Sequence, residues 1–221
     1  MTENKGRDRS LIWYSNRVKI GVIGALASGK TTFIKSISEK FHSISIKKYV
    51  EGIGYYDSTL AYDHGVCYAV KRNSETYERV SESEARRLMN EGEDIYRVEM
   101  WGSAGQLHLA GVRKTLIYPR VDGVLLFFDA SREGAVDLSL KIYREAKESI
   151  PLLGSSKPVI VVFNKIDLVN MEAAKSLAES VLKHLDEEYV ENETLFFTSA
   201  LKGINTWLPV NKMISFIYSS K

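Results

Sequence analysis

The sequence predicts an α/β fold, in which a doubly wound and mostly parallel β-sheet is flanked by helices. Three observations predict it. Strand-like and helix-like patterns alternate along the 221 residues, an order that builds parallel sheets with helices on both faces. Residues 121–129 form a nearly continuous apolar run, as a strand buried on both faces requires. The first strand-like run also leads directly into a glycine-rich turn and a helical pattern.

The expected elements follow one another in order. Strands are predicted where β-branched and aromatic residues gather, at 18–23, 59–72, 95–101, 121–129, 158–163 and 194–197. Helices are predicted where apolar residues recur at helical spacing, at 31–41, 136–150, 172–185 and 208–218. Pro151 stops the second helix, and Pro209 is tolerated in the first turn of the last. The polar, glycine-containing stretch 42–58 has too little periodicity for a core element, so we expect a long connection there.

Composition is that of an ordinary globular protein. Apolar residues make up 44% and charged residues 26%, and the net charge of +2 gives no general case for nucleic-acid binding. The single cysteine, Cys67, excludes an internal disulfide, fits a reducing cytosol and is interpreted as a small buried strand residue. No apolar run is long enough to span a bilayer, and neither end carries a signal-peptide core or a lipidation motif. We therefore expect a cytoplasmic protein without a direct membrane anchor.

The chain is interpreted as one domain over residues 17–221, preceded by an N-terminal extension at 1–16. Residues 73–94 are interpreted as an insertion between two strands that pair as a hairpin. Within it, Ser81 and Glu84 form a capping box that predicts the start of a short helix. Two alternatives stay open for this insertion: a functional element, or a solvated decoration.

A phosphate-binding motif follows the first predicted strand. Residues 24–31 read G-x-x-x-x-G-K-T, the P-loop, in the strand–turn–helix context that this motif needs. Its glycines let backbone N–H groups converge on one spot, and the helix N-terminus adds partial positive charge. Lys30 is expected to reach the β- and γ-phosphates of a nucleotide, and the Thr31 hydroxyl to ligate Mg²⁺. The predicted phosphate-binding residues are Gly24, Ala27, Ser28, Gly29, Lys30, Thr31 and Thr32.

A second motif predicts which base the site accepts. Asn164, Lys165 and Asp167 form N-K-x-D directly after the fifth predicted strand, at the sheet edge where the P-loop also lies. The Asp167 carboxylate offers two acceptors to the N1–H and N2–H₂ donors of guanine, an edge that adenine cannot match. The Lys165 stem can lie over the face of the base. The motif therefore predicts a guanine nucleotide, GTP or GDP.

With these two motifs the chain resembles the Ras-like small GTPases, and the resemblance runs over about residues 17–219. Residues 198–202 resemble the family's S-A-K/L loop. The resemblance implies that Ser199, Ala200 and Leu201 bind the nucleotide and that the Ala200 N–H meets guanine O6.

Two further segments resemble the switch regions of the family. Residues 101–106 resemble switch II, and Thr59 resembles the threonine of switch I. By this resemblance Thr59 binds Mg²⁺ and senses the γ-phosphate, the Gly105 N–H contacts that phosphate, and Gln106 orients the attacking water. The expected catalytic residues are Gln106, Lys30 and Thr59, and the expected metal ligands are Thr31 and Thr59.

Switch II departs from the family at one position. The acid that usually holds Mg²⁺ through water falls on Gly102. The patterns T-x-x-x-D-x-G at 59–65 and G-S-x-G-Q at 102–106 are similar to a prokaryotic branch of small GTPases. That branch is related to the gliding and polarity GTPases and to the β subunit of the signal-recognition-particle receptor. Two alternatives are open for Asp63: it replaces the missing acid near the metal, or it is an exposed strand residue.

The sequence leaves the partner surfaces and the source of a catalytic arginine open. Arg113 and Arg120 are candidates for the arginine that accelerates hydrolysis in small GTPases, and each is alternatively a surface or salt-bridge residue. Tyr55, Tyr56 and Trp101 could present an aromatic surface to a partner, and packing against the core is the alternative for Trp101.

The favoured interpretation is a GTP-binding molecular switch with slow intrinsic hydrolysis, which cycles between GTP and GDP states and controls a protein partner. Effectors and regulators are expected at 55–63 and 102–113, and a homodimer is a further hypothesis. One alternative is a GTP-binding scaffold or receptor subunit that does not hydrolyse, which Gly102 favours and which Gln106 and Thr59 disfavour. A metabolic nucleotide kinase is the other alternative, disfavoured by the N-K-x-D motif.

Overall fold

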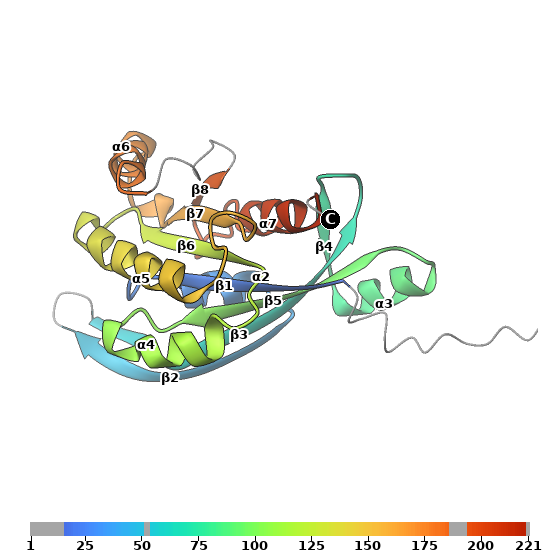
Figure 1. Cartoon of the computed structure of the whole chain (residues 1–221), viewed down its shortest axis with the longest axis horizontal. Coiled ribbons are helices and arrows are strands. Elements are labelled where there is room, and N and C mark those ends of the chain that lie inside the picture. Colours follow the sequence, from blue (N-terminus) through green and yellow to red (C-terminus); the bar gives the residue numbers. More distant parts are fainter. Residues whose placement is uncertain (1–15, 51–53, 186–193, 220–221) are drawn as a thin grey trace, which may run out of the picture.

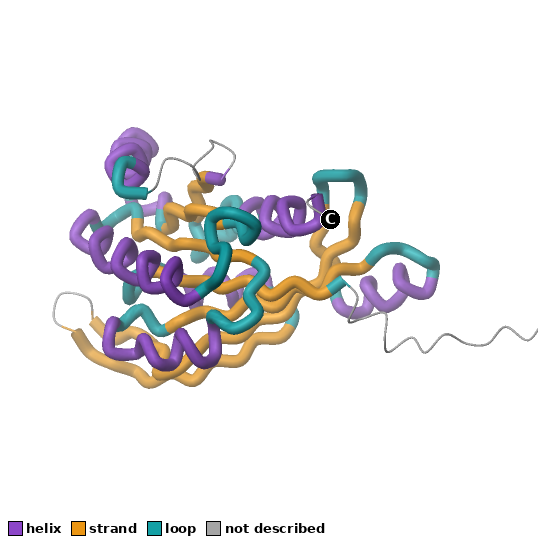
Figure 2. The backbone as a smooth tube through the Cα atoms, viewed as in Figure 1, coloured by secondary structure: helices purple, strands orange, loops and turns teal. Residues whose placement is uncertain are grey.

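The computed structural model describes residues 16–50, 54–185 and 194–219, and for residues 45–50, 54–61 and 219 it describes the backbone alone. An eight-stranded sheet forms the centre of the molecule, and helices lie on both of its faces (Figure 1). The smooth trace in Figure 2 shows the strands as one continuous twisted layer. Among the described residues, no helix is long and apolar enough to cross a membrane.

The strands of the sheet run in the order β2-β3-β5-β1-β6-β7-β8, and β4 pairs with β3 beside this row. The neighbours from β5 to β8 are parallel, whereas the β2–β3, β3–β4 and β3–β5 pairs are antiparallel. This mixed, mostly parallel sheet confirms the predicted fold class. The strands are β1 (Arg17–Gly24), β2 (Lys40–Val50), β3 (Gly54–Lys71), β4 (Tyr77–Val80), β5 (Ile95–Ser103), β6 (Gly123–Asp129), β7 (Val159–Asn164) and β8 (Leu195–Thr198). The α-helices are α2 (Lys30–Ile37), α3 (Glu82–Asn90), α4 (Ala110–Val112), α5 (Val136–Ser149), α6 (Met171–Leu182) and α7 (Leu208–Ser219).

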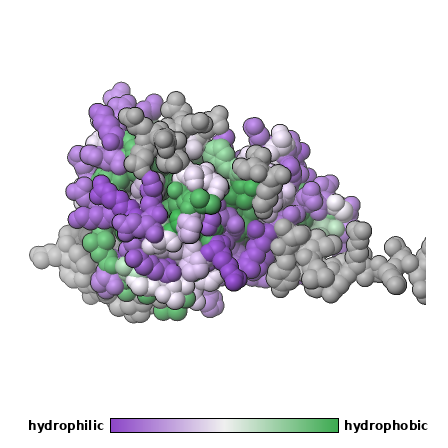
Figure 3. All heavy atoms as spheres, viewed as in Figure 1, coloured by the Kyte–Doolittle hydropathy of each residue, from purple (hydrophilic) through white to green (hydrophobic). Residues whose placement is uncertain are grey.

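Each face of the sheet buries its own apolar core. Side chains of α5 and α6 pack on one face, where Leu126, Phe128 and Val161 are almost fully buried. Helices α2 and α7 cover the other face, against alternate residues of β1 such as Val18 and Ile20. This alternation follows from the two-residue period of a strand, which points successive side chains to opposite faces. On the face shown in Figure 3, hydrophilic residues cover much of the surface and hydrophobic ones lie between them.

The segment after α2 differs from the sequence prediction. The helix predicted over 31–41 ends at Ile37, because Ser38 leaves helical geometry and its hydroxyl donates to the Ile34 carbonyl at 2.6 Å. The expected connection 42–58 is instead β2 and the start of β3, which form a long antiparallel ladder. This prediction was wrong because β2 is a polar edge strand whose backbone is stabilised by pairing with β3, and periodicity does not record that pairing.

The insertion contains the predicted short helix and one strand that sequence patterns did not indicate. Helix α3 begins after Ser81, whose hydroxyl accepts the Glu84 N–H at 3.2 Å, as its capping box predicts. Strand β4 precedes it. The indole N–H of Trp207, the residue before α7, donates to the Tyr77 carbonyl at 2.7 Å. Since β4 pairs with the last residues of β3, and Val70 of β3 faces Ile95 at the start of β5, the insertion lies at the end of the sheet opposite the P-loop (Figure 1).

Candidate nucleotide-binding site

The P-loop lies between the carboxyl end of β1 and the first turn of α2, as predicted. Both of its glycines are required by geometry. Gly24 has a φ of +139°, and a Cβ there would lie 2.3 Å from the Phe127 carbonyl oxygen. Gly29 has a φ of +91°, and a Cβ there would lie 2.1 Å from Nδ2 of Asn164. Ala27 between them also adopts a left-handed conformation, with a φ of 62°.

Lys30 is folded into the loop that it follows. Its Nζ donates to the carbonyls of Gly24 at 2.9 Å and Ala25 at 2.6 Å, and to the Ser28 hydroxyl at 3.3 Å. Burial lowers the pKa of Lys30 to about 7, and the nearby Asp63 carboxylate acts in the opposite direction. A bound phosphate would favour the charged form in the same way, so this ammonium suits an anionic ligand.

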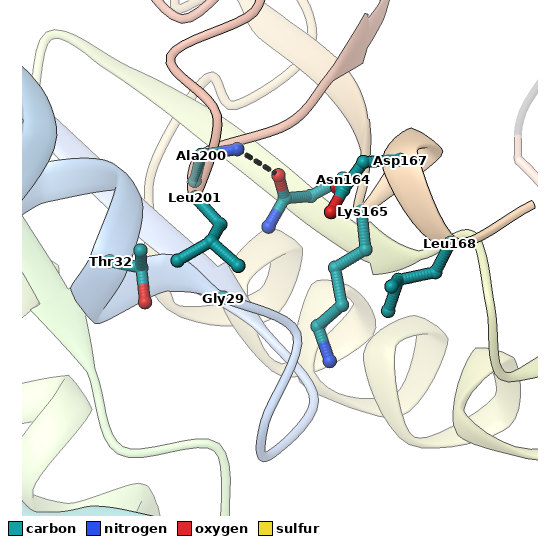
Figure 4. Close-up of a pocket in the computed structure, with 8 residues that line it drawn as sticks. All are labelled: Gly29, Thr32, Asn164, Lys165, Asp167, Leu168, Ala200 and Leu201. Atoms are coloured by element: carbon teal, nitrogen blue, oxygen red, sulfur yellow. Dashed lines mark hydrogen bonds between the residues drawn. The ribbon is translucent and has the colours of Figure 1, made fainter.

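A cavity of about 250 Å³ opens beside the P-loop (Figure 4). The residues that line it are Gly29, Thr32, Asn164, Lys165, Asp167, Leu168, Ala200 and Leu201. All except Leu168 were predicted to bind the nucleotide. The predicted Ser199 does not line the cavity; it is fully buried, and its hydroxyl accepts the Lys202 N–H at 3.2 Å.

Asn164 joins the loops around this cavity. It is 1% exposed, and its Nδ2 donates to the Ser28 carbonyl of the P-loop at 2.9 Å. Its Oδ1 accepts from the Thr198 hydroxyl at 3.1 Å and from the Ala200 N–H at 2.9 Å, the bond drawn in Figure 4. The Ala200 N–H would therefore have to share or exchange this bond to make its predicted contact with guanine O6.

The side chains of Lys165 and Asp167 differ in how they are held. Lys165 has a left-handed backbone with a φ of 68°, and its Nζ forms a 2.7 Å ion pair with Asp129. Asp129 is buried and also accepts from the Ser131 N–H and hydroxyl. Asp167 is exposed at the cavity, with its carboxylate accessible to a ligand. Two residues of the site were not predicted from the sequence. Asp129 is the last residue of the predicted strand 121–129, and Leu168 directly follows the N-K-x-D motif.

The surroundings of Asp63 decide against one of the two alternatives left open for it. Asp63 is fully buried, and its Oδ2 accepts from the Thr31 hydroxyl at 2.5 Å while its Oδ1 accepts from the Ser43 hydroxyl at 2.5 Å. The alternative that Asp63 is an exposed strand residue is therefore wrong. Carboxylate and hydroxyl oxygens are the ligand types that Mg²⁺ takes in proteins, so the residues present fit that ion.

The register between β3 and β5 explains why position 102 has no acidic side chain. Asp63 of β3 pairs directly with Gly102 of β5. A Cβ at Gly102 would lie 3.1 Å from the Asp63 Cβ and 2.6 Å from Cδ1 of Ile34. The missing side chain at position 102 thus leaves room for the carboxylate of the neighbouring strand.

The switch II segment lies against the P-loop. A Cβ at Gly105 would lie 2.3 Å from the Leu26 backbone nitrogen, so the two backbones are in close contact. Gln106 follows and is half-buried. Thr59 lies on β3, and its side chain, like those of Tyr55 and Tyr56, is outside the described part of the chain, so its predicted metal contact stays a prediction.

The remaining candidates have mainly structural positions. Arg113 is fully buried in an ion pair with Glu145 at 2.6 Å, which matches the salt-bridge alternative, whereas Arg120 is exposed. Trp101 packs against His64, with ring centroids 4.4 Å apart, and against the core on the α5 face. Cys67 is a free, buried thiol whose pKa burial raises to about 12, as expected of a packing residue.

A P-loop, a buried Asn164 that ties it to a second loop, and an oxygen-rich corner at Thr31 together define a P-loop nucleotide-binding protein. The model of the Ras family matches residues 66–215, and the chain therefore belongs to the Ras family as a small GTPase domain. The matched range begins after the P-loop, which is identified by its own motif and geometry. Members of this family generally bind guanine nucleotide with Mg²⁺, and they are typically GTPases and switches. A search of curated proteins found no match.

Proposed function

We propose that this chain is a molecular switch that binds GTP, hydrolyses it slowly and controls a protein partner through the difference between its GTP and GDP states. The observation that carries the proposal is Asn164, whose hydrogen bonds link the P-loop at Ser28 to the base loop at Ala200. Phosphate recognition and base recognition thereby share one site. The Asp167 carboxylate at the cavity supplies the acceptors that guanine requires.

Each described residue then has a task that its position allows. The P-loop N–H groups and the Lys30 ammonium bind the phosphates, and the Gly105 N–H approaches the γ-phosphate from switch II. Gln106 orients the attacking water. Thr31 and Asp63 would hold Mg²⁺, which supplies positive charge against the phosphate oxygens when bound.

We further propose that switching involves residues 55–63 and 102–113 together. The two segments are joined by the ladder in which Tyr62 pairs with Ser103 and Asp63 with Gly102. A γ-phosphate held by both segments would order them as a unit, and its loss would release them to a different arrangement that effectors and regulators distinguish.

We also propose that the chain belongs to the prokaryotic branch related to gliding and polarity GTPases and to the signal-recognition-particle receptor β subunit. The pairing of Gly102 with the buried Asp63 supports this, since both residues belong to the patterns that resemble that branch.

A non-hydrolysing GTP-binding scaffold or receptor subunit is the second candidate, and Gly102 is the observation that favours it. One experiment separates the two. We expect single-turnover phosphate release from GTP-loaded protein at about 10⁻⁴ to 10⁻³ per second, the range of intrinsic hydrolysis known for Ras itself. Gln106→Leu should bind GTP normally and release phosphate more slowly.

Two results of that experiment would contradict the proposal. Wild-type protein that holds GTP without releasing phosphate would support the scaffold. Equal release rates in wild type and Gln106→Leu would remove Gln106 from the water-orienting role.

A further inference from the structure

Arg113 is the largest fully buried side chain among the described residues, and it belongs to no part of the nucleotide cavity. It begins the π-helical turn η2 (Arg113–Ile117), a rare geometry that is frequent at functional sites. Its Nη1 donates to the carbonyl oxygens of Ala104 at 2.9 Å and Gln106 at 2.8 Å. These two carbonyls flank Gly105, so the guanidinium holds switch II on both sides of that glycine.

Glu145 of α5 holds the other side of the guanidinium. Its two carboxylate oxygens accept from Nε at 2.9 Å and Nη2 at 2.6 Å of Arg113, and Oε1 also accepts from the Tyr118 hydroxyl at 2.9 Å. Burial acts to raise the pKa of Glu145, and the hydrogen bonds from Arg113 and Tyr118 outweigh it, so that the pKa lies below its usual value. Both partners of this ion pair are therefore charged, and two parallel hydrogen bonds fix their relative orientation.

The same helix also holds the P-loop. The Ser139 hydroxyl of α5 accepts the Ala25 N–H at 2.9 Å and donates to the Phe127 carbonyl at 3.0 Å. Ser139 and Glu145 thus attach the phosphate loop and switch II to one rigid element. Because Gly105 already lies against Ala25 and Leu26, a shift of switch II relative to α5 would change its distance from the phosphates.

We propose that Arg113 and Glu145 are positioning residues for GTP hydrolysis, which clamp the backbone of residues 104–107 to α5 so that the Gly105 N–H and the Gln106 side chain face the γ-phosphate. This inference rests on the hydrolysis proposed above. GDP has no γ-phosphate, and its binding uses the P-loop and the base cavity. The side chains of Arg113 and Glu145 hydrogen-bond to each other, to Tyr118 and to the backbone of 104–107, and to neither of those two sites. The clamp therefore affects turnover and leaves GDP affinity unchanged.

Two variants test the clamp. Arg113→Lys keeps the charge but cannot supply the fork that reaches Glu145 and two carbonyls at once. Glu145→Gln keeps the shape but places an N–H donor toward the guanidinium. Single-turnover hydrolysis of bound GTP should fall about 10- to 100-fold in each, the scale of a lost positioning contact. The double variant should lose no more than the worse single one, because the pair acts as a unit.

Exposed residues of the same helix provide matched controls. Arg144→Lys and Glu148→Gln repeat the two substitutions on α5 away from the clamp, and both should hydrolyse GTP at the wild-type rate. GDP affinity and the melting temperature of the GDP complex are measured for every variant. If Arg113→Lys fails to fold, the nearly isosteric Glu145→Gln decides the question.

The outcomes distinguish this inference from the proposed function. Slower hydrolysis with unchanged GDP affinity supports the clamp. Unchanged hydrolysis in Glu145→Gln, or equal losses of hydrolysis and GDP affinity, overturns it while the GTPase function stands. Wild-type protein that binds GTP without hydrolysing it overturns the proposed function, and the inference with it.

Discussion

At the scale of single residues, the Lys30 ammonium is the group most directly committed to the phosphates. It now donates to the neutral carbonyls of Gly24 and Ala25. Phosphate oxygens are stronger partners for an ammonium because they carry negative charge. We expect Lys30→Ala to lower GTP and GDP affinity by at least about 100-fold, the loss of one or two such bonds. Isothermal titration calorimetry measures this, with the exposed Lys35→Ala on the same helix as control. Wild-type affinity in Lys30→Ala would contradict the P-loop assignment.

Asp167 is the residue on which base choice depends. It is exposed at the cavity, and its carboxylate matches the two donors of guanine. We expect Asp167→Asn to shift preference from guanosine to xanthosine nucleotides, because the extra carbonyl of xanthine takes a hydrogen bond from the new amide. Competition binding measures the shift, with the exposed Asp137→Asn as control. Equal losses for both nucleotides would mean that Asp167 supports its loop instead of contacting the base.

At the scale of elements, the pairing of β3 with β5 places Asp63 directly beside Gly102. Asp63 of β3 occupies the space beside Thr31 that Gly102 of β5 leaves open. We expect Asp63→Ala to raise the Mg²⁺ concentration needed for slow nucleotide release by about 10- to 100-fold, the usual cost of losing such a metal-supporting group. GDP affinity without Mg²⁺ should not change, and that measurement also checks the fold.

An exchange of the two positions gives the sharper comparison. The double variant Asp63→Gly and Gly102→Asp moves the carboxylate to the neighbouring strand and relieves the contact that an acid at 102 would make with Asp63. The end of the Ile34 side chain, whose Cδ1 would lie 2.6 Å from the new Cβ, must shift to admit it. We expect it to recover part of the Mg²⁺ dependence that Asp63→Ala loses. Nucleotide off-rates measured against Mg²⁺ compare the variants, with the exposed Asp94→Ala as control. Superimposable curves for wild type and Asp63→Ala would show that Asp63 does not serve the metal.

At the scale of the whole molecule, a bound nucleotide would tie together loops from distant parts of the chain. The cavity joins the P-loop after β1, the segment after β7 and the loop after β8. A ligand that binds only the folded state at 100 times its Kd stabilises it by about 2.7 kcal/mol. For a chain of this size we expect GDP to raise Tm by roughly 5–11 °C. Thermal melts measure the shift, and ATP at the same concentration is the control. An equal shift with ATP would contradict the predicted selectivity for guanine.

The sequence alone determined the parts of this protein that are written in contiguous residues. The buried strand β6, the P-loop between β1 and α2, and the N-K-x-D segment after β7 are local patterns. Their meaning depends on short-range geometry, such as the turn that Gly29 permits, and on the rule that carboxyl ends of parallel strands meet at one edge. The class of fold and most of the cavity could therefore be predicted before any contact was known.

Only the tertiary structure decided which distant side chains meet. The polar strand β2 exists through its ladder with β3, Asp63 reaches Thr31 through the register of β3, and the partners Arg113 and Glu145 come from separate elements. The same holds for Asp129 and Lys165. Charged and polar side chains carry no periodic signal that identifies their partners, and a shift of one residue in strand register would turn Asp63 to the other face of the sheet. Register and packing are fixed by the whole core, which is why these contacts could not be derived from local sequence.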